Sequence, residues 1–98
     1  MSKISIIAEL VVKPEYIAAY HEHIKAHAAR SLREDRGCRQ FDVMVPTDRP
    51  DAVFLYEIYD DEACFKEHAE SLRMAEYREA TRDMLLERRV TQSRVIGP

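Results

Sequence analysis

The sequence has 98 residues, of which 46% are hydrophobic and 34% charged, with a formal net charge of −3, and this mixture fits one small globular domain over residues 1–98. Acidic and basic side chains are interleaved without a basic stripe, so we expect no nucleic-acid partner, and no apolar run approaches the ~18 residues that cross a membrane. The first residues lack the long apolar core of a signal peptide, so we expect a cytoplasmic protein.

Residues 3–12 are predicted to form a strand, because β-branched residues alternate along them. One face would carry Ile4, Ile6, Ala8, Leu10 and Val12, and the other Ser5, Ile7, Glu9 and Val11. Both faces are largely apolar, which is typical of a strand that is covered on both sides.

Residues 15–35 are predicted to form a helix of about five turns, after a proline that suits a first turn. Its apolar stripe is expected to consist of Ile17, Tyr20, Ile24, Ala28 and Leu32. Gly37 would stop the helix in a left-handed conformation.

A hairpin is predicted after this helix. Strands over residues 38–45 and 52–59 are separated by a turn over 46–51, and so short a connection favours antiparallel pairing. In the second strand, alternation places Leu55, Glu57 and Tyr59 on one face and Phe54, Tyr56 and Ile58 on the other.

Asp61 is expected to cap a helix that runs to about residue 71 and carries Phe65, His68 and Leu72 on one face. A helical stretch over residues 74–88 follows, either as a kinked continuation or as a separate helix. A last strand is predicted over residues 90–96.

The predicted order is βαββαβ, an α+β, ferredoxin-like fold with a four-stranded antiparallel sheet and helices on one face. The opposite face would have Ile7, Val11, Met44 or Leu55 available to it, too many apolar side chains for a surface in contact with water. We therefore expect a homodimer formed through the open sheet face.

Motifs for metals and cofactors are absent from the sequence. Two glycines give no loop for a dinucleotide or a phosphate, and His21, His23 and His27 lack a nearby third metal ligand, so we expect surface histidines. Cys38 and Cys64 are expected to be buried thiols. We therefore expect no metal and no cofactor, and any catalysis would depend on acidic and basic side chains.

His68 is the leading candidate for moving protons near neutral pH, because a histidine stands where an apolar residue is expected. A core histidine held by hydrogen bonds is the alternative. Glu57, in mid-strand, is open to a catalytic role or to an ion pair with an arginine. Tyr56 and Tyr59 are open to simple packing with a solvated hydroxyl.

The chain resembles the antibiotic-biosynthesis-monooxygenase domain family over essentially its whole length. The resemblance is carried by Gly37, Cys38, Phe41 and Val43, by Phe54, Tyr56, Glu57 and Tyr59, and by Asp61, Ala63, Phe65 and His68. It implies a dimeric α+β barrel in which each subunit holds a small-molecule pocket between sheet and helices. It also implies site residues, which would be His68, Glu57 and His27 for catalysis and Tyr59, Phe65, Tyr56 and Phe41 for substrate binding.

Three functions stay open under this resemblance. The first, and the reason we expect an enzyme, is a cofactor-independent monooxygenase that oxidises a small quinol or phenolic substrate with O₂. The second is an isomerase of a small phosphorylated hydroxy-diketone, of the type that degrades autoinducer-2, with His68 and perhaps His27 as acid and base. The third is a non-catalytic dimeric ligand-binding module. Some polyketide-oxidising members of the family carry a tryptophan in the pocket, and this chain has none, so the resemblance argues against a large aromatic polyketide as substrate.

Overall fold

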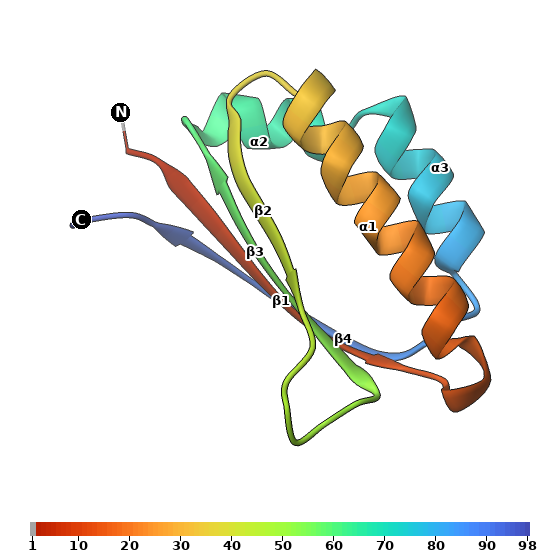
Figure 1. Ribbon diagram of the computed structural model, residues 1–98. Helices are drawn as coiled ribbons and strands as arrows, with labels where there is room; N and C mark the ends of the chain where they lie inside the picture. The colour runs from red at the N-terminus through yellow and green to blue at the C-terminus, as the bar shows by residue number, and fades with distance from the viewer. Residues whose placement is uncertain (1) are drawn as a thin grey trace.

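The computed structural model describes residues 2–98 as a four-stranded sheet with three α-helices packed on one of its faces (Figure 1). In chain order the elements are β1 (Ile4–Val12), the 3₁₀ turn η1 (Pro14–Tyr16), α1 (Ile17–Glu34), β2 (Cys38–Met44), β3 (Ala52–Tyr59), α2 (Glu62–Ala69), α3 (Leu72–Thr81) and β4 (Leu85–Arg94).

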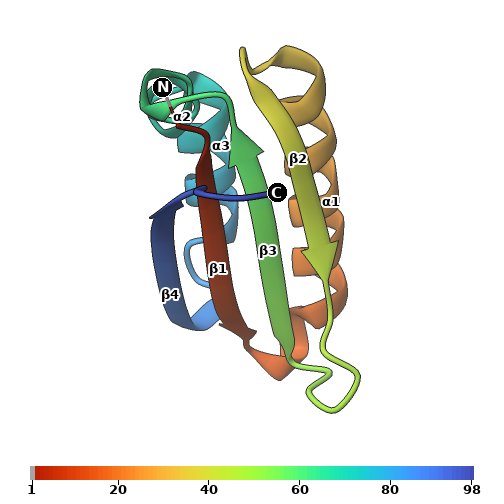
Figure 2. The same ribbon diagram turned by 90° about the vertical axis from the view of Figure 1, so that its left-hand side faces the viewer.

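The sheet order is β2-β3-β1-β4, and every neighbouring pair is antiparallel (Figure 2). β2 and β3 form the predicted hairpin, and β1 lies between β3 and β4. The predicted α+β, ferredoxin-like fold is therefore confirmed.

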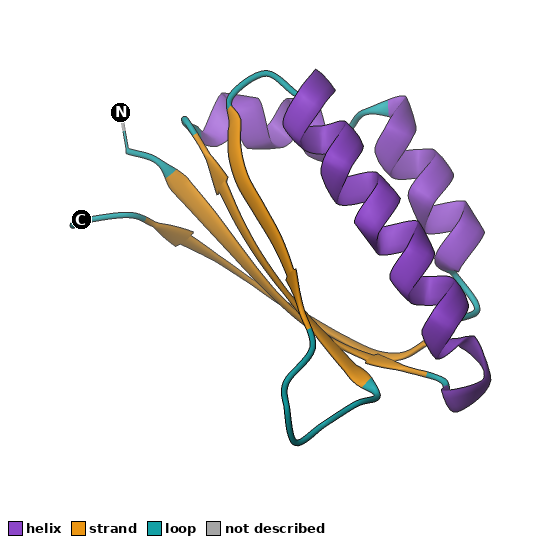
Figure 3. Ribbon diagram, in the orientation of Figure 1, coloured by secondary structure: helices purple, strands orange, loops and turns teal. Residues whose placement is uncertain are grey.

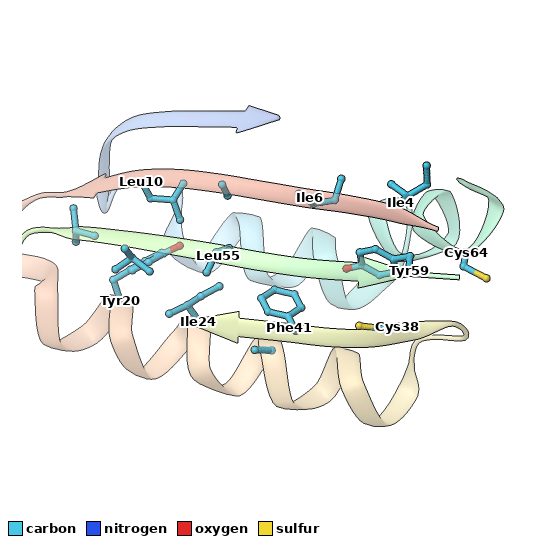
Figure 4. Close-up of a cluster of buried hydrophobic side chains, with 14 residues drawn as sticks. Ile4, Ile6, Leu10, Tyr20, Ile24, Cys38, Phe41, Leu55, Tyr59 and Cys64 are labelled. Atoms are coloured by element: carbon cyan, nitrogen blue, oxygen red, sulfur yellow. The ribbon is translucent and has the colours of Figure 1, made fainter. Parts of the chain in front are cut away.

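The helices cover a single face of the sheet, which we call the inner face (Figure 3). The strand register aligns Ile6 with Glu57 and Glu57 with Phe41, so these three side chains share that face. Tyr20 and Ile24 of α1 close over it and are fully buried. The core labelled in Figure 4 comprises Ile4, Ile6, Leu10, Tyr20, Ile24, Cys38, Phe41, Leu55, Tyr59 and Cys64.

The buried stripe of α1 departs from the prediction at its C-terminal end. Leu32 is 46% exposed, whereas His27 and Ser31 are buried beside Ala28. Successive turns of 3.6 residues carry the buried stripe from Ile24 to His27 and Ser31, away from Leu32. His27 is therefore no surface histidine, and its predicted exposure was wrong.

The C-terminal elements also differ from the prediction. β4 begins at Leu85, so the last four residues of the helix expected over 74–88 are strand, and α3 ends at Thr81. Leu72 is 75% exposed, because it starts α3 instead of extending the buried face of α2. β4 is an edge strand with charged side chains on both faces, so its sequence shows neither the helical nor the strand period clearly.

The face of the sheet opposite the helices, the open face, carries Ile7 of β1 and Met44 of β2, which are both more than 40% exposed. Leu55 was expected to be available to this face, but it is buried on the inner one, where it pairs with Ala8. Within residues 2–98, no helix combines the length and apolar character needed to cross a membrane.

Candidate active site

A cavity of about 410 Å³ lies between the inner face of the sheet and the helices. Ile6, Ala8 and Leu10 of β1 form its floor, and α1, α2 and α3 contribute the opposite wall. Its lining is mostly apolar, with a few titratable side chains, as is usual for pockets that bind small molecules.

His68 reaches this cavity from the last turn of α2. Asp61 caps the start of α2 by accepting a 2.9 Å hydrogen bond from the backbone N–H of Cys64, as predicted. At the other end, the Ser71 hydroxyl donates to the carbonyl of His68 at 2.8 Å and also caps α3. These hydrogen bonds fix both ends of α2. The His68 imidazole on its last turn is only 1% exposed.

The two ring nitrogens of His68 have different surroundings. Nδ1 lies 2.7 Å from Oδ2 of Asp35, which is itself paired with Arg73, whereas Nε2 finds no hydrogen-bond partner in the described part of the chain. Burial lowers the pKa of His68 to about 4, with a smaller contribution from the charge of Arg78, so the ring is neutral at pH 7. A neutral ring that donates from Nδ1 to a carboxylate leaves a free lone pair on Nε2.

Glu57 faces that lone pair from β3. Its Oε1 lies 3.8 Å from Nε2 of His68 and accepts a 2.6 Å hydrogen bond from the Tyr59 hydroxyl. Burial raises the pKa of Glu57 to about 7, although the bond from Tyr59 and the charge of Arg88 oppose the shift. A buried carboxyl that titrates near neutral pH beside a neutral imidazole can accept or return a proton.

Aromatic rings surround His68. The ring of His27 stacks on Tyr77 at a centroid distance of 4.3 Å and lies 5.6 Å from the ring of His68. Phe41 and Phe65 each lie 6.2 Å from His68. Burial lowers the pKa of His27 to about 4, and neighbouring charges add to the shift. Its Nε2 is also buried and without a partner among residues 2–98.

The structure brings most of the predicted site residues together. Those that line the cavity are His68, Glu57, His27, Phe41 and Phe65. Tyr59 does not line the cavity, and it contacts the site through its hydrogen bond to Glu57.

Tyr56 is the exception. It pairs with Ile7 and Asp42 in the sheet, which places it on the open face with the sheet between it and the cavity. Side chains alternate along a strand, so Tyr56 and Glu57 point in opposite directions. The structure therefore does not bring Tyr56 to the cavity where it was expected to contact substrate.

Sequence reasoning missed several residues of the site. Asp35 was only the end of a helix, yet it orients His68 across 33 residues of chain. Tyr77, Arg78 and Arg88 also line the cavity. Tyr77 and Arg78 lie in the helical stretch that is predicted over residues 74–88, whereas nothing local to Asp35 or Arg88 indicated a contact this distant in sequence.

The cysteines and the possible metal ligands are the other groups to place. Cys38 and Cys64 are both buried, as predicted, and burial raises the pKa of each thiol. No group of three or more metal-ligating side chains is present among residues 2–98.

Comparison with known proteins gives a consistent result. A sequence model of the antibiotic biosynthesis monooxygenase family matches residues 3–80. A solved structure from Bacteroides thetaiotaomicron is 25% identical, with a TM-score of 0.91 over 99% of this chain and 92% of that one. One from Nitrosomonas europaea is 23% identical, with a TM-score of 0.92 over 99% and 93% of the two chains.

Both of those proteins are provisionally named antibiotic biosynthesis monooxygenases. A third of the same provisional name, from Caulobacter crescentus, is 15% identical with a TM-score of 0.92 over 98% of this chain and 92% of that one. Below 25% identity such likeness shows the fold. No curated protein matches the chain.

Proposed function

The chain belongs to the antibiotic biosynthesis monooxygenase family, and on that premise we propose that it oxidises a small quinol or phenol with O₂ and without a cofactor. The observation that carries the proposal is Nε2 of His68, which is buried in the cavity wall beside Glu57 and has no hydrogen-bond partner among residues 2–98.

His68 is the base in the proposed reaction. A quinol hydroxyl placed at Nε2 gives up its proton to the ring, and the hydrogen bond from Nδ1 to Asp35 stabilises the imidazolium that forms. The cavity is largely apolar, so the resulting phenolate loses most of its hydration. An electron-rich phenolate held in this way can pass an electron to O₂.

The balance of the reaction needs no other reductant. One electron moves from the phenolate to O₂, and the two radicals join through a new C–O bond at a ring carbon that carries hydrogen. Loss of that hydrogen as a proton and cleavage of the O–O bond then give a hydroxyquinone and water. A quinol plus O₂ thus yields a hydroxyquinone plus H₂O, with four electrons lost by the substrate and four gained by O₂.

Glu57 has the second role. Its pKa of about 7 leaves it partly protonated at neutral pH, so it can supply the proton that the peroxide oxygen needs when it leaves as water. The 3.8 Å separation between Oε1 and Nε2 of His68 lets the pair exchange protons through the substrate or a water. Tyr59 holds Glu57 in place.

The experiment is O₂ consumption with hydroquinone by purified protein treated with a chelator. We expect uptake above the buffer rate that depends on His68, and loss of that uptake in His68→Gln with an unchanged circular dichroism spectrum. Uptake at the buffer rate for a panel of small quinols and phenols would contradict the proposal.

An isomerase is the second candidate, because two neutral histidines face the same cavity with their rings 5.6 Å apart. Such a pair can remove a proton from one carbon or oxygen of a substrate and return it to another. Incorporation of deuterium from D₂O into a small phosphorylated hydroxy-diketone, without O₂ uptake, would favour this reading over oxidation.

We further propose that two copies associate through the open face of the sheet. Ile7 and Met44 are exposed there beside the half-buried Phe54 and Tyr56, while every helix lies on the other face (Figure 1). Covering these side chains removes apolar surface from water.

A further inference from the structure

Three arginines line the cavity that holds His68. Arg78 and Arg82 come from α3 and the residue that follows it, and Arg88 comes from β4. Arginine is otherwise unusual in a pocket whose remaining wall is mainly aliphatic and aromatic.

Among the described residues, two of the three guanidinium groups have no acidic partner. Across residues 2–98, the arginines that form ion pairs with carboxylates are Arg30, Arg33, Arg36, Arg39, Arg73, Arg82 and Arg89. Arg78 and Arg88 are not among them. Arg82 is paired with Glu79 at 3.3 Å, so Arg78 and Arg88 are the arginines of the wall that are free to bind an anion.

The strand register fixes where Arg88 stands relative to the acid–base pair. Arg88 pairs with Leu10, whose side chain is buried on the inner face, whereas Glu57 pairs with Ile6. Leu10 and Ile6 are four residues apart on β1, which is roughly 13 Å along the strand. An arginine side chain and one aromatic ring together can span most of that distance.

The charges of Arg78 and Arg88 affect the pKa values of His68 and Glu57, respectively. Burial lowers the pKa of His68, and Arg78 lowers it further. Arg88 opposes the rise that burial causes in the pKa of Glu57. Glu87 also contacts the cavity, but it pairs with Val11, which places its side chain toward the open face. Arg78 and Arg88 therefore add positive charge to the cavity wall, and the register places Arg88 away from Glu57 along the sheet.

We propose that the cavity binds a small aromatic molecule with an anionic group, a carboxylate or a phosphate, that Arg78 and Arg88 hold while its hydroxyl lies at His68. The orientation of the hydroxyl rests on the proposed function, but the anion site does not. Guanidinium groups suit both anions, because their N–H groups form charge-assisted, often paired hydrogen bonds with the oxygens.

The experiment is calorimetric titration without O₂, so binding is measured independently of any oxidation. The probes are 2,5-dihydroxybenzoate, its methyl ester, hydroquinone and the monophosphate ester of hydroquinone. We expect the wild-type protein to bind one of the two anions at least about tenfold more tightly than the neutral probes, as a charge-assisted hydrogen bond would produce. Which anion binds more tightly distinguishes carboxylate from phosphate.

Matched variants locate the site. Arg78→Gln and Arg88→Gln should each reduce the preference for the anion, and the double variant should abolish it, whereas Arg88→Lys should keep most of it. Arg89→Gln is the control, since Arg89 is the next residue on β4 and pairs with Glu9 on the open face. Binding of both anions no tighter than that of the neutral probes by the wild type, or equal effects of Arg88→Gln and Arg89→Gln, would overturn the proposal.

The outcome is separable from that of the proposed oxidation. His68→Gln should keep the preference for the anion while it loses O₂ uptake. A protein that prefers the anion but consumes no O₂ with any probe would keep the anion site and contradict only the oxidation.

Discussion

At the scale of single residues, the contact between His68 and Asp35 determines whether the His68 ring can act as a base in the cavity. The carboxylate fixes the proton on Nδ1 and so leaves Nε2 free toward the cavity. Arg73 in turn holds Asp35 from α3. Asp35 does not itself line the cavity and acts through His68, so we regard it as a positioning residue.

Substitutions at this pair should separate the two roles. His68→Gln should lower kcat roughly 10²–10⁴-fold, the range for loss of a general base. Asp35→Asn should lower kcat with little change in KM and should shift the pH profile, because the amide N–H₂ can reverse the tautomer of His68. Glu67→Gln is the control, because Glu67 lies on the helix of His68 and its exposed ion pair, with Arg36, lies away from the ring. Asp35→Asn kinetics equal to those of Glu67→Gln would contradict the role of Asp35.

The raised pKa of Glu57 predicts a pH-dependent stability. The folded protein holds this proton up to pH of about 7, whereas the unfolded chain releases it near 4.5, so folding stability falls as pH rises between these values. Glu57→Gln lacks this loss. We expect the variant to match the wild type near pH 4 and to exceed it by on the order of 2–3 kcal/mol above pH 7.

Urea unfolding at pH 4.5, 6 and 8 measures the difference between Glu57→Gln and the wild type. The two proteins share every other side chain, so the difference isolates residue 57. A difference that is constant across the three pH values would show that Glu57 ionises normally in the fold.

At the scale of single residues, the sequence predicted part of the candidate site. His68 and Glu57 stood out because each interrupts an apolar pattern, and the structure places both in the cavity wall. Asp35 and Arg88 contact the site through pairings fixed only by the tertiary fold, so no local pattern pointed to them. His27 was assigned to the surface because it lies on a charged helix without a nearby third metal ligand, although its own face of α1 is buried.

Among the elements, the connection from α1 to β2 depends on Gly37. This residue has a φ of +76°, and a Cβ there would lie 2.5 Å from Sγ of Cys64 on α2. The left-handed backbone alone costs an alanine about 1–2 kcal/mol, and the contact with the thiol adds to it. Gly37 therefore lets β2 pass close to the helix that carries His68.

Gly37→Ala should accordingly lower the free energy of unfolding by about 2 kcal/mol or more, measured by urea denaturation. Gly97→Ala is the matched control, because a Cβ at Gly97 meets no atom within 4 Å. Equal stabilities of the two variants would show that the fold relaxes around residue 37 without strain.

Element boundaries show where sequence patterns lose information. The hairpin and the cap at Asp61 were predicted correctly, because turn and cap chemistry is local. The start of β4 was placed five residues too late, at 90 instead of Leu85. This strand forms because it pairs with β1, and its charged sequence shows no clear period of alternating polar and apolar residues.

For the whole molecule, periodicity was sufficient to predict the layers, since four alternating or apolar strands and two helical regions leave few arrangements. The cavity was not predictable in the same way. Its volume depends on how Phe41, Tyr77 and the α1 residues fill the space under the helices, and packing of that kind is not visible in a linear pattern.

The proposed dimer is testable at the same scale. Ile7→Lys places a charge in the middle of the open face, where Ile7 pairs with Tyr56 and Thr91. We expect a dimer of the wild type and a monomer of the variant in light scattering coupled to size exclusion. Leu72→Lys, at an exposed position on α3, is the control and should leave the mass unchanged. A monomeric wild type at all concentrations would contradict the dimer.

The most direct test of the proposed chemistry follows the oxygen atoms. Metal-free protein is mixed with hydroquinone under ¹⁸O₂ and quenched within one turnover for mass spectrometry, with His68→Gln in parallel. We expect one ¹⁸O atom in each hydroxyquinone, one O₂ consumed per quinol, and product from the variant only at the buffer rate. A product free of ¹⁸O, or equal product from His68→Gln and the wild type, would contradict oxidation by this site.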